Sequence, residues 1–284
     1  MRARRRLLAA LGLVGFVLAA PSAGATPPPL SEVQVIPLPG VERRIDHFAV
    51  DPAGKRLFVA ALGNGTLEVL DIGAGKRADN LRYDAAAGQL YLGYGEGALG
   101  VIEPSSLKLV ASIPVGGHPE SFRLEETGPR VFVNVPATGE VLVVDRRQRS
   151  TVMHIPLGGP SNNYPMSLDE SGHRLFVGVR RPAQLLVFDT LSGKRLAAVP
   201  CVGDTDDLFY DARRDRVYVI GGEGYVDVFD AAASGKYDRL ARIATRAGAR
   251  TGLWSGELDR LFVAWPSRGG HPAEIHVLGA PGGT

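Results

Sequence analysis

Short runs of apolar residues recur along the chain, and most are bounded by Gly, Pro, Asn or Asp. Six of them share one pattern, in which a basic or polar residue precedes an apolar, an aromatic and a second apolar residue: RLFV at 56–59, QLYL at 89–92, RVFV at 130–133, RLFV at 174–177, RVYV at 216–219 and RLFV at 260–263. Runs this short and this rich in Val, Phe and Tyr are typical of β-strands. The pattern therefore predicts an all-β protein built from a repeated unit.

Each of these anchor runs is flanked by further predicted strands. A second run, usually ending in an acid, follows at 66–71, 98–103, 140–145, 184–189, 225–230 and 274–279. A shorter run that closes on an acid precedes the anchor, as at 47–51 and 207–211. A fourth run follows most copies, at 109–115, 151–157, 195–202 and 238–244, and a separate strand at 33–38 precedes the first copy. We expect four-stranded antiparallel units, with 33–38 completing the last one.

The length of the repeat indicates which architecture the strands form. Self-similarity at a period of about 40 residues is typical of propellers and solenoids. Runs that are apolar throughout suit sheets that are buried on both faces between neighbouring sheets. We therefore expect a β-propeller of six blades with mostly four strands each, closed by pairing of the N-terminal and C-terminal strands, which protects the sheet edges at the junction.

One interval in the array is irregular. The aromatic anchors Phe58 and Tyr91 lie 33 residues apart, whereas later anchors are separated by 41 to 44 residues. No fourth strand fits between Arg77 and Ala78, so either the first blade lacks its outer strand or a longer segment with a whole repeat has been lost. In both cases the run at 66–71 presents an open edge, which is a candidate surface for self-association.

The repeats resemble the YVTN-type, WD40-like β-propeller family over nearly the whole domain. The resemblance rests on the R-[LV]-[FY]-V and V-x-V-Φ-D strands (Φ, apolar), the SGKR turn at 192–195 and the IPLG strand at 155–158. Members of this family commonly have seven blades and act as binding or scaffold modules. The resemblance therefore implies that one repeat has been lost here and that the protein binds a ligand or a partner.

The N-terminus has the pattern of an export signal. Four arginines precede an apolar run at 7–20, and a small-residue cleavage pattern follows at 23–25. This pattern predicts a signal peptide at 1–25, a spacer at 26–32, a single propeller domain at 33–284 and a periplasmic or secreted protein. Removing the leader leaves 28 basic against 30 acidic residues, so there is no global signature of nucleic-acid binding, and no transmembrane segment is expected.

Three residues with distinctive chemistry are interpreted as packing residues of the strands. Cys201 is the single cysteine and lies among apolar neighbours, which favours a small buried hydrophobe over a reactive thiol. Trp254 and Trp265 are interpreted as packing residues between blades rather than as a stacking platform.

The loops that lead into the innermost strands line one mouth of a propeller channel, which is the default ligand site. Aligned as tetrads, they cover 44–47, 77–80, 118–121, 162–165, 204–207 and 249–252, and their third positions are Asp46, Asp79, Glu120, Tyr164, Asp206 and Thr251. Such a ring of acids needs compensation by a cation, by Arg250 and the histidines, or by solvent. The alternative is that these acids cap turns and bind loop amides.

We therefore expect a binding site for a small ligand or a protein partner at this mouth, formed by Arg44, Asp46, His47, Asp79, Asn80, His118, Glu120, Asn163, Tyr164, Asp206, Asp207 and Arg250. No nucleophile motif stands beside a histidine, so nothing in the sequence requires an enzyme or a cofactor. The alternative is a calcium-dependent hydrolase, similar to the six-bladed lactonases, that uses the same acids with His47 or His118 as base. Carboxylate and amide oxygens from separate blades would supply the calcium ligands.

Overall fold

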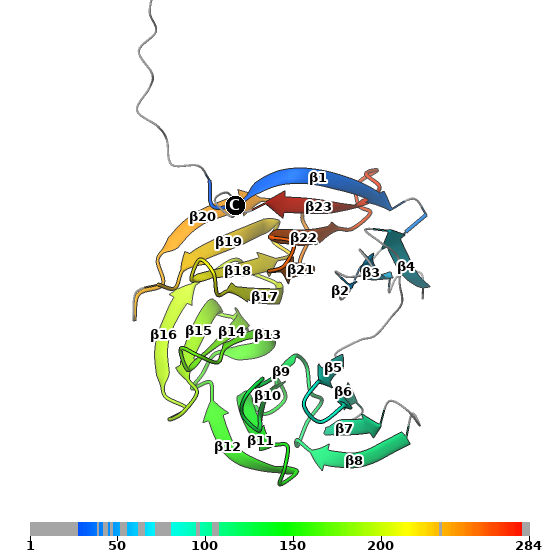
Figure 1. Ribbon diagram of the computed structural model, residues 1–284. Coiled ribbons are helices and arrows are strands. Elements are labelled where there is room, and N and C mark those ends of the chain that lie inside the picture. Colours follow the sequence, from blue (N-terminus) through cyan, green and yellow to red (C-terminus); the bar gives the residue numbers. More distant parts are fainter. Residues whose placement is uncertain are drawn as a thin grey trace, which may run out of the picture.

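The computed structural model describes residues 28–38, 40, 41, 45, 48–51, 56–61, 66–71, 81–94, 97–103, 108–232 and 235–279. The predicted leader and the tetrad residues Arg44, Asp46, His47, Asp79 and Asn80 lie outside these residues. Every regular element in the described part is a strand, as the sequence predicts. The strands form five four-stranded sheets and one three-stranded sheet, arranged side by side around a common centre (Figure 1).

The six sheets are numbered here in chain order. Sheet 1 contains β2 (Phe48–Asp51), β3 (Arg56–Ala61) and β4 (Thr66–Asp71), and sheet 2 contains β5 (Leu81–Asp84), β6 (Gln89–Tyr94), β7 (Ala98–Glu103) and β8 (Lys108–Pro114). Sheet 3 contains β9 (Phe122–Leu124), β10 (Arg130–Val135), β11 (Glu140–Asp145) and β12 (Ser150–Pro156), and sheet 4 contains β13 (Ser161–Asp169), β14 (Arg174–Arg181), β15 (Ala183–Asp189) and β16 (Arg195–Pro200). Sheet 5 contains β17 (Thr205–Asp211), β18 (Arg216–Gly221), β19 (Tyr225–Asp230) and β20 (Arg239–Ala244), and sheet 6 contains β21 (Gly252–Ser255), β22 (Arg260–Trp265), β23 (Ala273–Gly279) and β1 (Ser31–Leu38).

Within each sheet, neighbouring strands pair antiparallel, and the strand that comes first in the repeat lies innermost (Figure 1). The outer strands β8, β12, β16 and β20 fall within two residues of the predicted fourth strands at nearly every boundary. Alternate residues of these outer strands are exposed, whereas β10, β14 and β18 are buried on both faces. The continuous apolar runs in the sequence therefore correspond to strands in the middle of a sheet that is covered on both sides.

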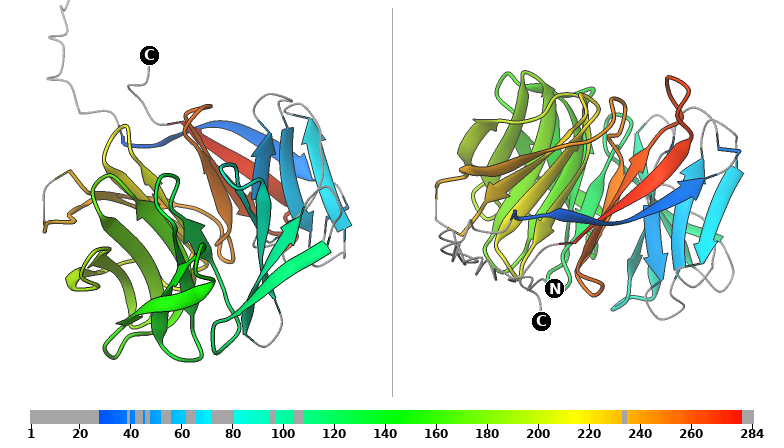
Figure 2. Two further views of the ribbon diagram at one scale, coloured as in Figure 1. Left: turned by 60° about the horizontal axis from the view of Figure 1, so that its bottom comes forward. Right: turned by 90° about the horizontal axis from the view of Figure 1, so that it is seen from above.

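The two ends of the described chain meet in sheet 6. Strand β1 pairs antiparallel with β23, from Ser31 opposite Gly279 to Leu38 opposite Ala273, and the two strands run side by side in Figure 2. Strand β1 is thus the fourth strand of the last sheet, where the sequence places it, although it begins two residues earlier than expected, within the predicted spacer. Leu30, just before β1, is buried in the core between sheets 5 and 6.

Sheet 1 has three strands in the described part of the chain, with β4 at its outer edge. Contacts between inner strands run from β2 through β21, β17, β13 and β9 to β5. Among the described strands, no contact of similar extent joins β5 back to β2, and this is the irregular interval in the sequence. The closed six-bladed ring and self-association through β4 stay predictions.

The hydrophobic core is divided into clusters that lie between consecutive sheets. One cluster joins Phe132 and Val143 of sheet 3 to Leu175 and Val177 of sheet 4, all four of them buried completely. Cys201 lies in the next cluster, where burial raises the pKa of its thiol to about 12, which agrees with its interpretation as a small hydrophobe. Trp254 and Trp265 pack against the core between sheets 5 and 6, also as predicted. No helix in the described residues is both long and apolar enough to span a membrane.

The arginine that begins the repeated anchor run connects one sheet to the next. The guanidinium of Arg174 lies 5.5 Å from the ring centroid of Phe176, and Nη1 donates a hydrogen bond to the carbonyl of Ala231 in sheet 5. Arg130 makes the same two contacts, with the ring of Phe132 in its own sheet and with the carbonyl of Thr190 in sheet 4.

The same arginine also neutralises the buried acid that closes the innermost strand. Arg174 donates to Asp169 at 2.8 Å through Nε, and Arg130 donates to Glu125 at 2.9 Å. In sheet 5, Arg216 instead reaches the carbonyl of Pro29 at 3.2 Å, so the segment before β1 takes the place of the next sheet's turn. The arginine of the anchor run thus links sheet 3 to sheet 4, sheet 4 to sheet 5, and sheet 5 to the segment before β1.

We predict that Arg174→Ala lowers the free energy of unfolding by about 3–4 kcal/mol, because it leaves the carboxylate of Asp169 buried without its counter-ion. The matched control is Arg213→Ala, whose side chain is 54% exposed and 3.7 Å from Asp259. The control should cost less than about 0.5 kcal/mol. Urea denaturation measures both. Equal losses in the two variants would show that the repeated arginine is not a structural link.

We predict that deleting residues 28–38 lowers the melting temperature far more than deleting 280–284. The longer deletion removes Leu30 and Leu38, each 2% exposed, and bares the edge of β23. Two buried leucines contribute about 3–6 kcal/mol, and a domain of this size loses about 2–4 °C per kcal/mol. A fall of at least about 6 °C is therefore expected by calorimetry. Similar melting temperatures for the two truncations would contradict the structural role of β1.

Candidate functional site

The tetrads of sheets 4 and 5 lie within the innermost strands rather than in loops before them. Strand β13 begins at Ser161 and β17 at Thr205, so residues 163–165 and 205–207 belong to the ladders. The pairing register of both strands shifts at this point. In sheet 4 the shift lies between Asn163 and Met166, and in sheet 5 it lies between Thr205 and Asp207. The third tetrad residue, Tyr164 or Asp206, lies within the shift. Such β-bulges re-aim a side chain. Asp206 meets Arg180 of sheet 4 and Arg250 near the start of sheet 6, whereas Tyr164 lies against Arg180 of its own sheet.

Alignment by sequence spacing places the tetrad of sheet 6 one residue too far toward the C-terminus. Leu208, which follows the tetrad of sheet 5, pairs with Val219, the last residue of the anchor run. Gly252 pairs with the corresponding Val263 in sheet 6, so the tetrad of sheet 6 ends just before Gly252 and covers 248–251. Its third position is therefore Arg250 and not Thr251. The first positions agree with this register, because Asn162, Asp204 and Gly248 all have positive φ angles of 62°, 53° and 90°. Asn, Asp and Gly are the residues that adopt this backbone conformation most readily.

The third positions of sheets 4 to 6 meet in one network of charges, which we call the mouth network: Tyr164, Arg180, Asp204, Asp206 and Arg250. Arg180, near the end of β14, lies 4.2 Å from the ring centroid of Tyr164. Its guanidinium also contacts Asp206 and lies 3.3 Å from Asp204. Arg250 lies 2.9 Å from Asp206 and donates to both oxygens of Asp204 at 3.0 Å.

The described part of the ring therefore supplies its own counter-ions. Two carboxylates face two guanidinium groups, and both arginines are about one-fifth exposed while Asp204 is 41% exposed. In the part of the chain that the structure describes, no three His, Cys, Asp or Glu side chains are grouped to hold a metal ion. Asp46 and Asp79, which belong to the predicted calcium set, lie outside that part.

The other predicted site residues fall into two groups. Asn163 is buried completely, and its amide donates to Asn134 at 2.9 Å and to the carbonyl of Glu140 at 3.0 Å, so it braces sheet 4 against sheet 3. Asp207 accepts a hydrogen bond from the amide of Gly252 at 2.8 Å, which links sheets 5 and 6. His118 is exposed and Glu120 is half-buried, and both lie just before β9 of sheet 3.

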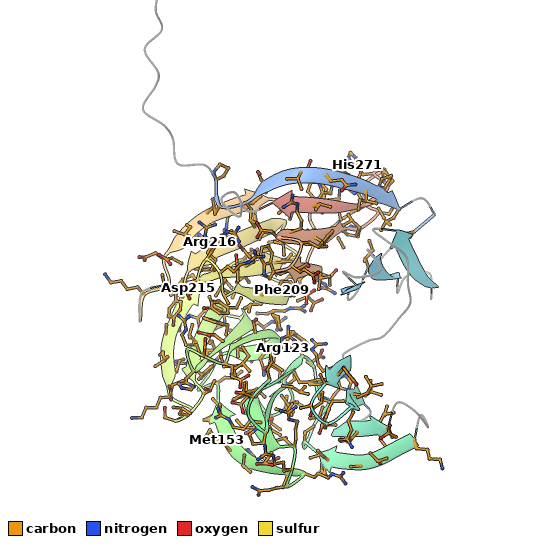
Figure 3. All side chains as sticks on the ribbon, in the orientation of Figure 1. Arg123, Met153, Phe209, Asp215, Arg216 and His271 are labelled. Atoms are coloured by element: carbon orange, nitrogen blue, oxygen red, sulfur yellow. The ribbon has the colours of Figure 1, made fainter. Side chains whose placement is uncertain are left out.

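A second set of inner residues was missed by sequence reasoning. The ladders place one residue of each innermost strand opposite the aromatic anchor, and in sheets 2 to 6 these are Arg82, Arg123, Ser167, Phe209 and Leu253. Arg123 and Phe209 lie toward the inner side of their sheets (Figure 3). The signal in the sequence is an arginine at the second position of LRYD (81–84) and FRLE (122–125), where other copies have a small or apolar residue.

A cavity of about 860 Å³ opens at the other end of the innermost strands, across sheets 3 to 5. It is lined by Arg123, the turn at 125–129, Ser167, Glu170 and Tyr210, among others. Because each strand begins at the mouth network and ends at this cavity, the two sites lie at opposite ends of the inner strands. The volume falls within the range of small-molecule sites, about 300–1,000 Å³.

Glu170 joins two of the turns that border this cavity. Its carboxylate accepts hydrogen bonds from the amides of Glu126, Thr127 and Gly128 at 2.5, 3.0 and 3.2 Å and from the Thr127 hydroxyl. Partial burial would raise the pKa of Glu170, but these hydrogen bonds outweigh it and hold the pKa below its usual range. The charged carboxylate therefore fixes the turn of sheet 3 to the turn of sheet 4.

Comparison with known proteins supports the architecture. No family model matches the chain, and no curated protein is similar to it, so the YVTN-type resemblance is not confirmed. The chain is similar to one in the crystal structure of the mitotic checkpoint complex, with a TM-score of 0.57 and 10% identity over 94% of this chain and 98% of that one. It is also similar to the hydrazine synthase of Kuenenia stuttgartiensis, with a TM-score of 0.61 and 15% identity over 78% and 80%. Both are β-propeller proteins, so the fold is a β-propeller.

We predict that Glu170→Gln lowers stability at neutral pH and that the difference from the unchanged protein shrinks in acid. A carboxylate with a lowered pKa stabilises the fold above its ordinary pKa of about 4.3, and this stabilisation is lost as the pH falls through the lowered value. Melting temperatures between pH 3 and pH 7 test this, with the exposed Glu257→Gln as control. A difference that stays constant over this range would rule out the proposed role of the charge.

Proposed function

We propose that this protein is an exported binding propeller whose partner docks at the mouth network. The observation that carries the proposal is the contrast between repeated and non-repeated residues. The half-buried arginines Arg130 and Arg174 occupy the same place in sheets 3 and 4 and make the same contacts. The third tetrad positions of neighbouring sheets are instead a tyrosine, an aspartate and an arginine. Residues that only support the repeat should be alike from sheet to sheet.

The chemistry of the mouth network suits a polypeptide partner. Arg180, Arg250 and Asp204 are partly exposed, so donors and acceptors of both signs face solvent within a few ångströms of one another. Among the described residues, the two guanidinium groups and the two carboxylates of the network balance in charge, which favours a partner with mixed polar groups over a simple cation or anion. Electrostatic complementarity of this kind sets orientation and specificity in protein interfaces. The similar propeller in the mitotic checkpoint complex belongs to an assembly, which agrees with a scaffold role for the fold.

The other parts of the proposal come from the sequence. The leader at 1–25 supports export to the periplasm or the medium, and the short interval between Phe58 and Tyr91 supports six blades derived from a seven-bladed array. The calcium-dependent hydrolase stays an alternative prediction from the acids of the tetrads, and its ligands would have to include residues outside the described part of the chain.

The proposal predicts that Arg250→Gln abolishes partner capture without unfolding the protein. The fold should persist, because Arg180 still contacts both Asp204 and Asp206. Affinity purification after crosslinking in the producing cell should recover one protein with the unchanged chain and at least about tenfold less of it with Arg250→Gln, as expected for a central interface arginine. Arg239→Gln, on the outer strand β20, is the matched control and should capture normally.

Two results would contradict this function. Equal capture by Arg250→Gln and the control would move the binding surface elsewhere. A rise in melting temperature with calcium of about 5–10 °C, reversed by a chelator, would favour the hydrolase, since saturating ligand at 100 times its Kd adds about 2.7 kcal/mol.

A further inference from the structure

The innermost strands carry different side chains on the two sides of the fold. Opposite the aromatic anchors, sheets 2, 3 and 4 place Arg82, Arg123 and Ser167, whereas sheet 5 places Phe209, which lies across the centre from Arg123 in Figure 3. The structural repeat does not require polar residues here, because Phe209 and Leu253 occupy the same position. Two adjacent arginines near the centre therefore call for a separate explanation.

Among the described residues, no carboxylate forms an ion pair or a hydrogen bond with Arg123, and Asp207 acts on it through its charge alone. Its guanidinium donates one hydrogen bond, to the carbonyl of the preceding Phe122 at 3.0 Å, although the side chain is largely shielded from solvent. Arg82 lies close by, with its guanidinium 5.6 Å from the Phe122 ring centroid. A half-buried guanidinium with one hydrogen bond to the protein keeps most of its five donors for a ligand or for solvent.

The electrostatics agree with this geometry. Burial lowers the pKa of Arg123 far below that of an ordinary guanidinium, and the like charge of Arg82 lowers it further. The carboxylate of Asp207 raises the pKa of both arginines, but it also accepts a hydrogen bond from the amide of Gly252. An anion beside Arg123 would relieve the cost of burial and the repulsion together.

The acids that border the cavity are already engaged. Glu125 is paired with Arg130, Asp169 is paired with Arg174, and Glu170 accepts three backbone amides and a hydroxyl. Arg123 is then the basic group of the cavity wall whose donors remain available. Ser167 lines the same cavity, and its hydroxyl oxygen accepts from the Tyr210 amide at 3.1 Å, which leaves its O–H to donate. Leu124, Leu168 and Ala212 add apolar surface to the cavity.

We propose that Arg123 and Ser167 bind the carboxylate of a small organic acid that enters this cavity. A guanidinium matches a carboxylate through two parallel hydrogen bonds. A monoanion fits better than a phosphate dianion, because four carboxylates border the cavity and only one guanidinium is available. The apolar wall favours an acid with a hydrocarbon body. This site lies at the opposite end of the inner strands from the mouth network, so it goes beyond the proposed partner binding.

Calorimetric titration of the purified protein with benzoate, acetate and inorganic phosphate at constant ionic strength tests the proposal. Benzoate should bind most tightly, acetate more weakly because it lacks the hydrocarbon body, and phosphate weakest. Arg123→Gln should weaken benzoate at least about tenfold, as expected when a charge-assisted hydrogen bond is lost. The exposed Arg147→Gln is the matched control and should bind as the unchanged protein does.

Melting temperatures without ligand separate a binding role from a structural one. Arg123→Gln should melt at the same temperature as the unchanged protein or higher, because it removes a buried charge and its repulsion with Arg82. A lower melting temperature combined with unchanged benzoate binding would show that Arg123 only supports the fold. Absence of binding by all three anions, or tighter binding of phosphate than of benzoate, would equally overturn the proposal.

Discussion

The contact between one arginine and the next sheet is the interaction on which this fold depends. Strands that are apolar on both faces bury well against one another, but apolar packing alone does not fix how far one sheet is turned relative to its neighbour. The guanidinium of Arg174 fixes this rotation, because it stacks on Phe176, neutralises Asp169 and donates to the carbonyl of Ala231 in the following sheet. A planar group with five donors in a rigid fork suits this task, whereas lysine is a point charge on a flexible stem.

Once that link holds the sheets together, the innermost strands are free to differ. Met166 and Leu208 of the inner strands pack into the clusters between sheets, but the residues at the start of each strand and opposite the anchor differ from sheet to sheet. The start of each inner strand can therefore hold Tyr164, Asp206 or Arg250 without disturbing the repeat, and its middle can hold Arg123 or Phe209. Both candidate sites consist of residues at such positions, one at each end of the inner strands.

The sequence was a good guide to the strands and a weaker one to the site. Burial on both faces leaves a continuous apolar signal in the middle strands β10, β14 and β18, and the outer strands β8, β12, β16 and β20 begin and end within about two residues of the predicted runs. The bulges at Tyr164 and Asp206 leave no such signal, since a register shift depends on the partner strand. An alignment by spacing alone therefore placed Thr251 where the ladder has Arg250. The sequence alone does not distinguish Asn163, a buried amide bonded to the neighbouring sheet, from an exposed amide that could bind a ligand.

The arginines of the inner strands show where a repeat is most informative. In a single copy, the arginine of FRLE at 122–125 reads as an exposed residue of an amphipathic strand. Aligned with the other copies, it occupies a position that holds serine, phenylalanine or leucine elsewhere, opposite an anchor that is always aromatic. The anchor is constant because packing between the sheets requires an aromatic residue there. Packing does not determine the residue that faces the anchor, so differences at this position between sheets indicate a role other than support of the fold. In this protein, departures from the repeat on the innermost strands are thus stronger indications of function than the repeated residues themselves.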